Sequence, residues 1–134
     1  MRNTRRTSIL VTAAAGALML FAAPAFAAQL DKEIAAAAQH AGFAAAAGDI
    51  GGVHTHLHHT INCLVGPEGE GFAEKELNPC KPLGNGAIPD AEDDETRASL
   101  EEALASANAG LAEEDLDAAK GHAAETQTKL DALK

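Results

Sequence analysis

Four of the six histidines in the chain lie within the segment HTHLHH, residues 54–59. A neutral imidazole nitrogen is a good ligand for copper, nickel or zinc. His54 and His58 are four residues apart, a spacing that places two side chains on the same face of a helix, where they could bind one ion. The segment therefore predicts a metal site. The alternative is that its histidines are polar residues at the edge of an ordinary helix.

The residues around this segment predict a helix from Ile50 to Leu64. Apolar residues recur there at spacings of three and four, which is typical of a helix with one buried face. The apolar positions are Ile50, Val53, Leu57, Ile61 and Leu64. Leu57 lies at the centre of this stripe and inside the histidine segment. The histidines must therefore flank the buried face.

At about 100° per residue, the histidines fall into groups on either side of Leu57. His54 and His58 lie together on one flank. His56 lies on the other flank, and His59 points almost directly away from the core. We therefore expect His54 and His58 to be the first candidate ligands and His56 to be a further candidate. His59 is the least favourable ligand unless another segment covers it.

A second helix is predicted before the break at Gly48. His40 lies eight residues before this glycine and His56 lies eight residues after it, so the two share one level of an antiparallel hairpin. If the hairpin turns one way, His40 approaches His56 and becomes a candidate ligand. If it turns the other way, His54 and His58 face small residues of the first helix. The sequence does not choose between the two hands.

Residues 65–90 are rich in glycine, proline and asparagine, which predicts an unusually long loop. An even number of cysteines in an exported chain favours a disulfide, so we expect Cys63 and Cys80 to close part of this loop. If the thiols were free instead, Cys63 would itself be a metal ligand close to His59. The loop carboxylates that could add an oxygen ligand are Glu68, Glu70, Glu74 and Glu76.

The halves of the chain are similar to each other. Helices are predicted over residues 30–47 and 50–64, from about residue 90, and over about 114–133. AAAAQHAGF in the first helix resembles ALASANAGL in the third, and DIGGVHTHL resembles DLDAAKGHA in the fourth, which makes His122 a further candidate ligand. We expect an all-α fold, an antiparallel up-down-up-down four-helix bundle of two similar hairpins.

The first 27 residues have the features of a secretory signal peptide. Three arginines precede an apolar stretch, and Ala25-Phe26-Ala27 matches a cleavage site. Cleavage leaves residues 28–134 as one small domain, which we expect in the periplasm or outside the cell. This domain has seven basic and twenty acidic residues, a net charge of −13. Such a charge favours cations as partners and argues against nucleic acid and against membrane insertion or anionic lipid.

The segments HAGFAAAAGDIGGVHTHLHH and ANAGLAEEDLDAAKGHA resemble the small periplasmic metal-binding proteins. These are exported, alanine-rich four-helix bundles that carry histidines at helical spacing and bind copper, nickel and other divalent ions. This chain has no histidine in its third predicted helix, so we expect at most one or two ions. The resemblance covers residues 35–64 and 100–133, and the metal ligands that it implies are His40, His54, His58 and His122.

We therefore predict an exported protein that binds Cu, Ni or Zn through helix-borne histidines and buffers or sequesters the ion. The alternative is a metal-free interaction or adaptor module of the cell envelope that uses the disulfide-closed loop to bind a protein partner. No haem is expected, because residues 28–134 lack methionine and the chain has no Cys-x-x-Cys-His motif. No catalysis is expected, because the chain has neither a Ser/His/Asp order nor a glycine-rich phosphate loop.

Overall fold

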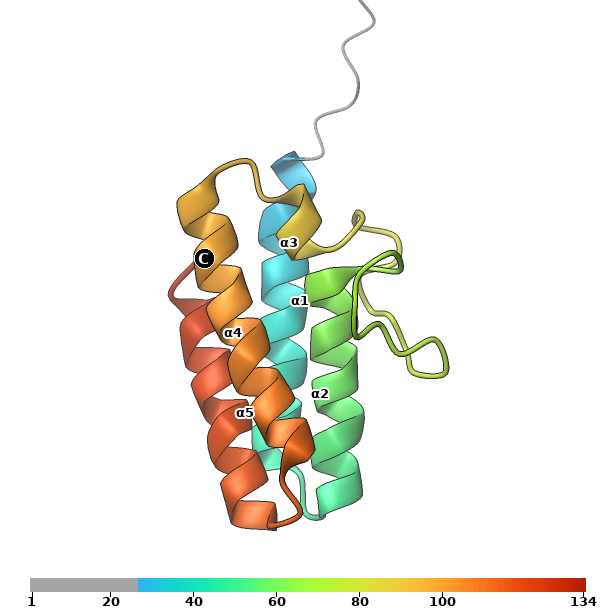
Figure 1. The fold of residues 1–134 in the computed structure, drawn as a ribbon, viewed down its shortest axis with the longest axis vertical. Coiled ribbons are helices and arrows are strands. Elements are labelled where there is room, and N and C mark those ends of the chain that lie inside the picture. Colours follow the sequence, from blue (N-terminus) through green and yellow to red (C-terminus); the bar gives the residue numbers. More distant parts are fainter. Residues whose placement is uncertain (1–26) are drawn as a thin grey trace, which may run out of the picture.

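The computed structural model describes residues 27–134, and this part of the chain is helical, with no strand. The all-α prediction is therefore confirmed. Four long helices lie side by side, and the loop after α2 projects on the side of α2 that faces away from α5 (Figure 1). The predicted signal peptide lies outside the described residues as far as residue 26. The helices are α1 (Ala27–Ala46), α2 (Ile50–Val65), α3 (Ala87–Asp90), α4 (Asp94–Ala112) and α5 (Leu116–Asp131).

Each long helix packs against two principal neighbours. α1 contacts α2 and α5, while α4 contacts α5 and α2. Alanine fills about half of the buried apolar positions on these helices, which lets the helices approach closely. Gly110 of α4 is the extreme case, because a Cβ at that position would lie 2.7 Å from Cδ1 of Leu57. The larger side chains of the core are fully buried: Ile34, Leu57, Ile61, Leu64, Leu100 and Leu130.

Aspartates fix where three of the helices begin. Asp49, Asp93 and Asp115 each accept a hydrogen bond from the backbone N–H three residues later, which satisfies a donor that the first helical turn leaves free. α4 consequently begins at Asp94, later than the predicted start near residue 90. Asp90 does not cap α4, because its carboxylate accepts hydrogen bonds from the backbone and side chain of Asn85.

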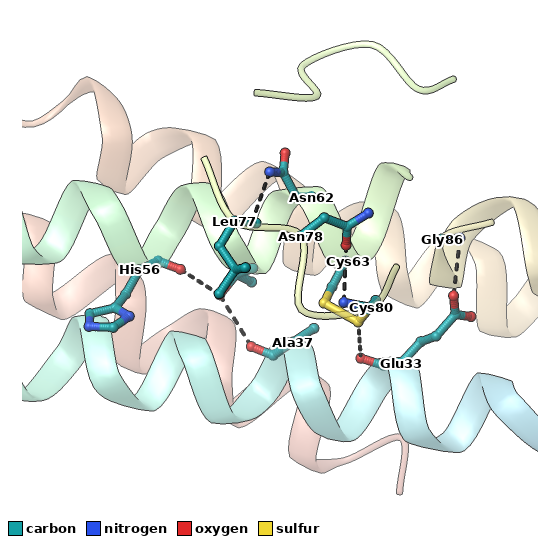
Figure 2. The surroundings of a disulfide bond; sticks show 10 residues. Glu33, Ala37, His56, Asn62, Cys63, Leu77, Asn78, Cys80 and Gly86 are labelled. Atoms are coloured by element: carbon teal, nitrogen blue, oxygen red, sulfur yellow. Dashed lines mark hydrogen bonds between the residues drawn. A yellow bond between two sulfur atoms is a disulfide. The ribbon is translucent and has the colours of Figure 1, made fainter. Parts of the chain in front are cut away.

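The loop between α2 and α4 is fastened to the helices at several points. The predicted disulfide is present, with the Cα atoms of Cys63 and Cys80 5.1 Å apart. Figure 2 shows this bond together with Asn62, which donates to the carbonyl of Leu77. Near the end of the loop, the carboxylate of Glu33 accepts a hydrogen bond from the N–H of Gly86 at 3.1 Å (Figure 2). The predicted loop therefore has a defined path, and residues 87–90 within it form the one-turn helix α3.

No helix among the described residues combines the length and the apolar character that crossing a membrane requires.

Candidate metal centre

The packing of α1 against α2 brings His40 to His56. Their Nδ1 atoms are 3.4 Å apart, although the residues are sixteen positions apart in sequence. The sequence left two arrangements open, and the structure has the one in which His40 approaches His56 rather than the one in which His54 and His58 face the first helix. The other flank of α1 is used differently, because a Cβ at Gly42 would meet the side chain of Gln127 on α5.

His59 completes a triad with these two side chains. The ring centroids are 5.7 Å apart for His40 and His56, 5.1 Å for His40 and His59, and 5.5 Å for His56 and His59. Each ring offers a nitrogen that lies within 4.8 Å of the nitrogens offered by the other two. Such a group could hold a metal ion, because three imidazoles converge from two helices that the short turn at residues 47–49 holds together.

The prediction that His59 faces solvent is wrong. Only 8 % of this residue is exposed. The reason is that the loop folds over the outer face of α2, and Glu76 of the loop places its Oε2 3.7 Å from Nε2 of His59. The Nδ1 atom of His59 is buried and has no hydrogen-bond partner within residues 27–134. Its lone pair or proton is therefore not engaged by any other protein group that the structure describes.

The surroundings of His40 and His59 favour the neutral form of both rings. The pKa of His40 is lowered from 6.5 to about 4, mainly by burial and in smaller part by positive charge on His59 and His56. Burial also lowers the pKa of His59, with a second contribution from His56, while the carboxylate of Glu76 acts in the opposite direction. A neutral imidazole has a free lone pair, so protons compete only weakly with a metal ion for these two residues near pH 7.

Phe43 packs against the triad from α1. Its ring centroid lies 5.4 Å from those of His40 and His56, with an edge-to-face arrangement in each case. The residue is nevertheless exposed, with 45 % of its surface accessible to solvent. Sequence reasoning missed this residue, although its position three residues after His40 places both on one face of α1.

The other predicted ligands lie elsewhere. His54 places Nε2 2.9 Å from the carbonyl oxygen of Glu113, just after the end of α4. His58 is partly buried, and within the described residues its Nδ1 has no hydrogen-bond partner. Although these two were the first candidates, no third histidine, cysteine or carboxylate of the described chain joins them in a ligand group.

His122 lies on α5, outside the triad. Its Nε2 is 3.7 Å from the carboxylate of Glu113 and its Nδ1 is 3.9 Å from that of Glu125. The weak internal similarity paired this residue with His56, but the structure does not bring the two into one group. His122 instead faces carboxylates, as a histidine on an acidic surface does.

Comparison of the chain with protein-family models, with curated proteins and with solved structures finds no match.

Proposed function

We propose that this protein binds a divalent transition metal ion at His40, His56 and His59 and acts without catalysis, as a buffer or carrier of that ion. The observation that carries the proposal is the convergence of three imidazoles from two helices, and burial lowers the pKa of two of them, His40 and His59. Imidazole nitrogen suits copper, nickel and zinc, and hard cations prefer oxygen ligands instead. The acidic surface supports the proposal, because it concentrates cations near the site.

We further propose that the protein is exported before it acts. We also propose that its four long helices form an antiparallel up-down-up-down bundle. The disulfide supports export, because such bonds persist in oxidising compartments. The three-residue connections at 47–49 and 113–115 support the antiparallel arrangement, since short connections join helices that run in opposite directions. The resemblance of the sequence to the small periplasmic metal-binding proteins also supports metal binding after export.

Calorimetric titration of residues 28–134 with Cu(II), Ni(II) and Zn(II) tests the proposal. At least one metal should bind with a Kd well below about 100 µM, at one ion per chain. His40→Ala and His56→Ala should each weaken binding at least tenfold, because each removes one of three ligands. His122→Ala is the matched control and should bind as the wild type does. Equal losses in the control, or no binding of any metal by the wild type, would contradict the proposal.

A further inference from the structure

We infer that Glu76 is a positioning residue of the histidine triad: it holds the proton of His59 on Nε2 and so leaves Nδ1 to bind the metal. This inference rests on the proposed function and deepens it. It assigns a role to the loop that crosses α2. Metal binding by three helical histidines alone would not require this loop.

The two nitrogens of His59 have different surroundings. Nε2 faces the Glu76 carboxylate at 3.7 Å, whereas Nδ1 is buried and has no hydrogen-bond partner in the described chain. An imidazole that binds a metal through one nitrogen carries its proton on the other, and a carboxylate near that proton fixes both the tautomer and the ring orientation. Glu76 therefore selects Nδ1 as the donor atom.

The choice of Nδ1 agrees with the rest of the triad. His40 and His56 already direct their Nδ1 atoms toward each other, at 3.4 Å. The donor set is then three δ nitrogens, two supplied by the hairpin and one selected by the loop. The negative charge of Glu76 also offsets part of the positive charge that a bound ion would bring into a partly buried site.

The position of Glu76 is built into the fold. Asn62, fully buried and one turn beyond His59, donates to the carbonyls of Ala73 and Leu77 at 3.1 Å each. It also accepts a hydrogen bond from the N–H of Ala73 at 2.8 Å. These bonds hold the chain on both sides of Glu76 against α2 (Figure 2 shows the one to Leu77).

The disulfide fastens the same stretch a few residues later. Cys63 follows Asn62 on α2 and is bonded to Cys80. His59, Asn62 and Cys63 thus lie along one helix, and each contacts the loop segment 73–80 in turn. Glu74 belongs to this segment too, but it is exposed and forms no ion pair within residues 27–134. It is therefore a matched control for the loss of one loop carboxylate.

Zinc titrations of residues 28–134 carrying Glu76→Ala, Glu76→Gln or Glu74→Ala test the inference. Glu76→Ala should weaken zinc binding about 10- to 100-fold, the usual loss when the carboxylate partner of a ligand histidine is removed. Glu76→Gln should recover part of the loss, because its amide keeps an acceptor oxygen facing Nε2 of His59. Glu74→Ala should bind as the wild type does, and all metal-free variants should melt at similar temperatures.

The tautomer provides a readout that a merely structural role would not change. In the zinc-loaded wild type, ¹⁵N chemical shifts of the His59 ring should report a protonated Nε2 and a metal-bound Nδ1. In Glu76→Ala they should report Nε2 binding or a mixture. If Glu76→Ala matches the wild type in both affinity and tautomer, the inference is wrong while metal binding stands. If the wild type binds no metal, the proposed function fails first and the inference falls with it.

Discussion

Among single residues, Glu33 has the most unusual environment outside the triad. It is completely buried, its Oε1 accepts the N–H of Gly86, and its Oε2 has no hydrogen-bond partner within the described residues. Asp90 lies close by, and a Cβ at Gly84 would meet the carboxylates of both. Burial raises the pKa of Glu33 to about 7, and the charge of Asp90 adds to the increase, although the Gly86 hydrogen bond opposes it.

The raised pKa makes the stability of the fold depend on pH. Glu33 ionises near pH 4.5 in the unfolded chain but near pH 7 in the folded protein. The folded state therefore binds more protons between these values, and the stability linked to this residue is complete below pH 4.5 and lost as pH rises through 7. The loss at higher pH amounts to at most about 3 kcal/mol, at roughly 1.4 kcal/mol per pKa unit.

We expect Glu33→Gln to be more stable than the wild type at pH 8, because the amide keeps an acceptor for Gly86 and removes the buried charge. The difference should shrink toward zero as the pH is lowered to 4.5. Urea unfolding at several pH values measures it, with Glu101→Gln on the exposed face of α4 as the control for losing one charge. A difference that stays constant, or grows on acidification, would contradict the assigned ionisation.

How well the site could be predicted also depends on single residues. The pairing of His40 with His56 followed from counting residues on either side of Gly48, but the hand of the hairpin did not, because it depends on how α1 and α2 pack against α5. The place of His59 in the triad could not be recognised from its own helix. Its burial depends on a loop whose path is set by Asn62 and Cys63, and helical periodicity carries no information about that path.

Among the elements, the end of α2 is the most constrained point of the backbone. Gly66 follows the helix with φ of 68°, a conformation that side chains other than glycine rarely adopt. A Cβ on this residue would lie only 1.6 Å from the carbonyl oxygen of Asn85. The last turn of α2 and the segment before α3 therefore pack backbone against backbone, which leaves no space for a methyl group.

Gly66→Ala should lower the free energy of unfolding by more than about 2 kcal/mol, since backbone strain and the clash with Asn85 add together. Gly121→Ala on α5 provides the comparison, because nothing lies within 4 Å of its added Cβ. That variant should be more stable than the wild type by up to about 1 kcal/mol, the gain in helix propensity from glycine to alanine. Thermal or urea unfolding of the two variants would refute this account if they shifted equally.

The long helices could be predicted because their signals are local. Apolar residues at spacings of three and four indicated the helix that became α2, and Gly48 marked the break that precedes it. Helix α3 could not be predicted, because its single turn depends on Glu33 and Asn85 fixing the residues around it rather than on any periodicity of its own. The start of α4 was misplaced for a related reason, since several acidic residues compete to cap it.

For the whole molecule, the dominant property is uncompensated negative charge. Residues 28–134 have a net charge of −13. Among the basic residues that the structure describes, only Arg97, Lys129 and Lys134 form ion pairs with carboxylates. Most acidic side chains therefore repel one another across a small domain, and this repulsion opposes the compact state.

Added salt should consequently stabilise the metal-free protein. Raising NaCl from 10 mM to 0.3 M shortens the screening length from roughly 30 Å to below 10 Å, which is less than the width of the bundle. We expect a gain of about 1 kcal/mol, or a rise in Tm of about 4–8 °C at pH 8. Calorimetric melting with a chelator present measures this. A Tm that falls with salt would indicate that attractive ion pairs outweigh the repulsion.

The disulfide and the triad lie one after the other along α2, and this order has a consequence for the unfolded chain. The disulfide between Cys63 and Cys80 closes a loop between residues that are seventeen positions apart in sequence. An ion bound by the triad would close a second loop, from His40 to His59, which ends four residues before the disulfide loop begins. The two loops do not overlap, so each removes its own set of unfolded conformations. Their entropic effects on the unfolded chain would therefore add, whereas in the folded protein the disulfide and the ion would be linked through the segment that carries Glu76.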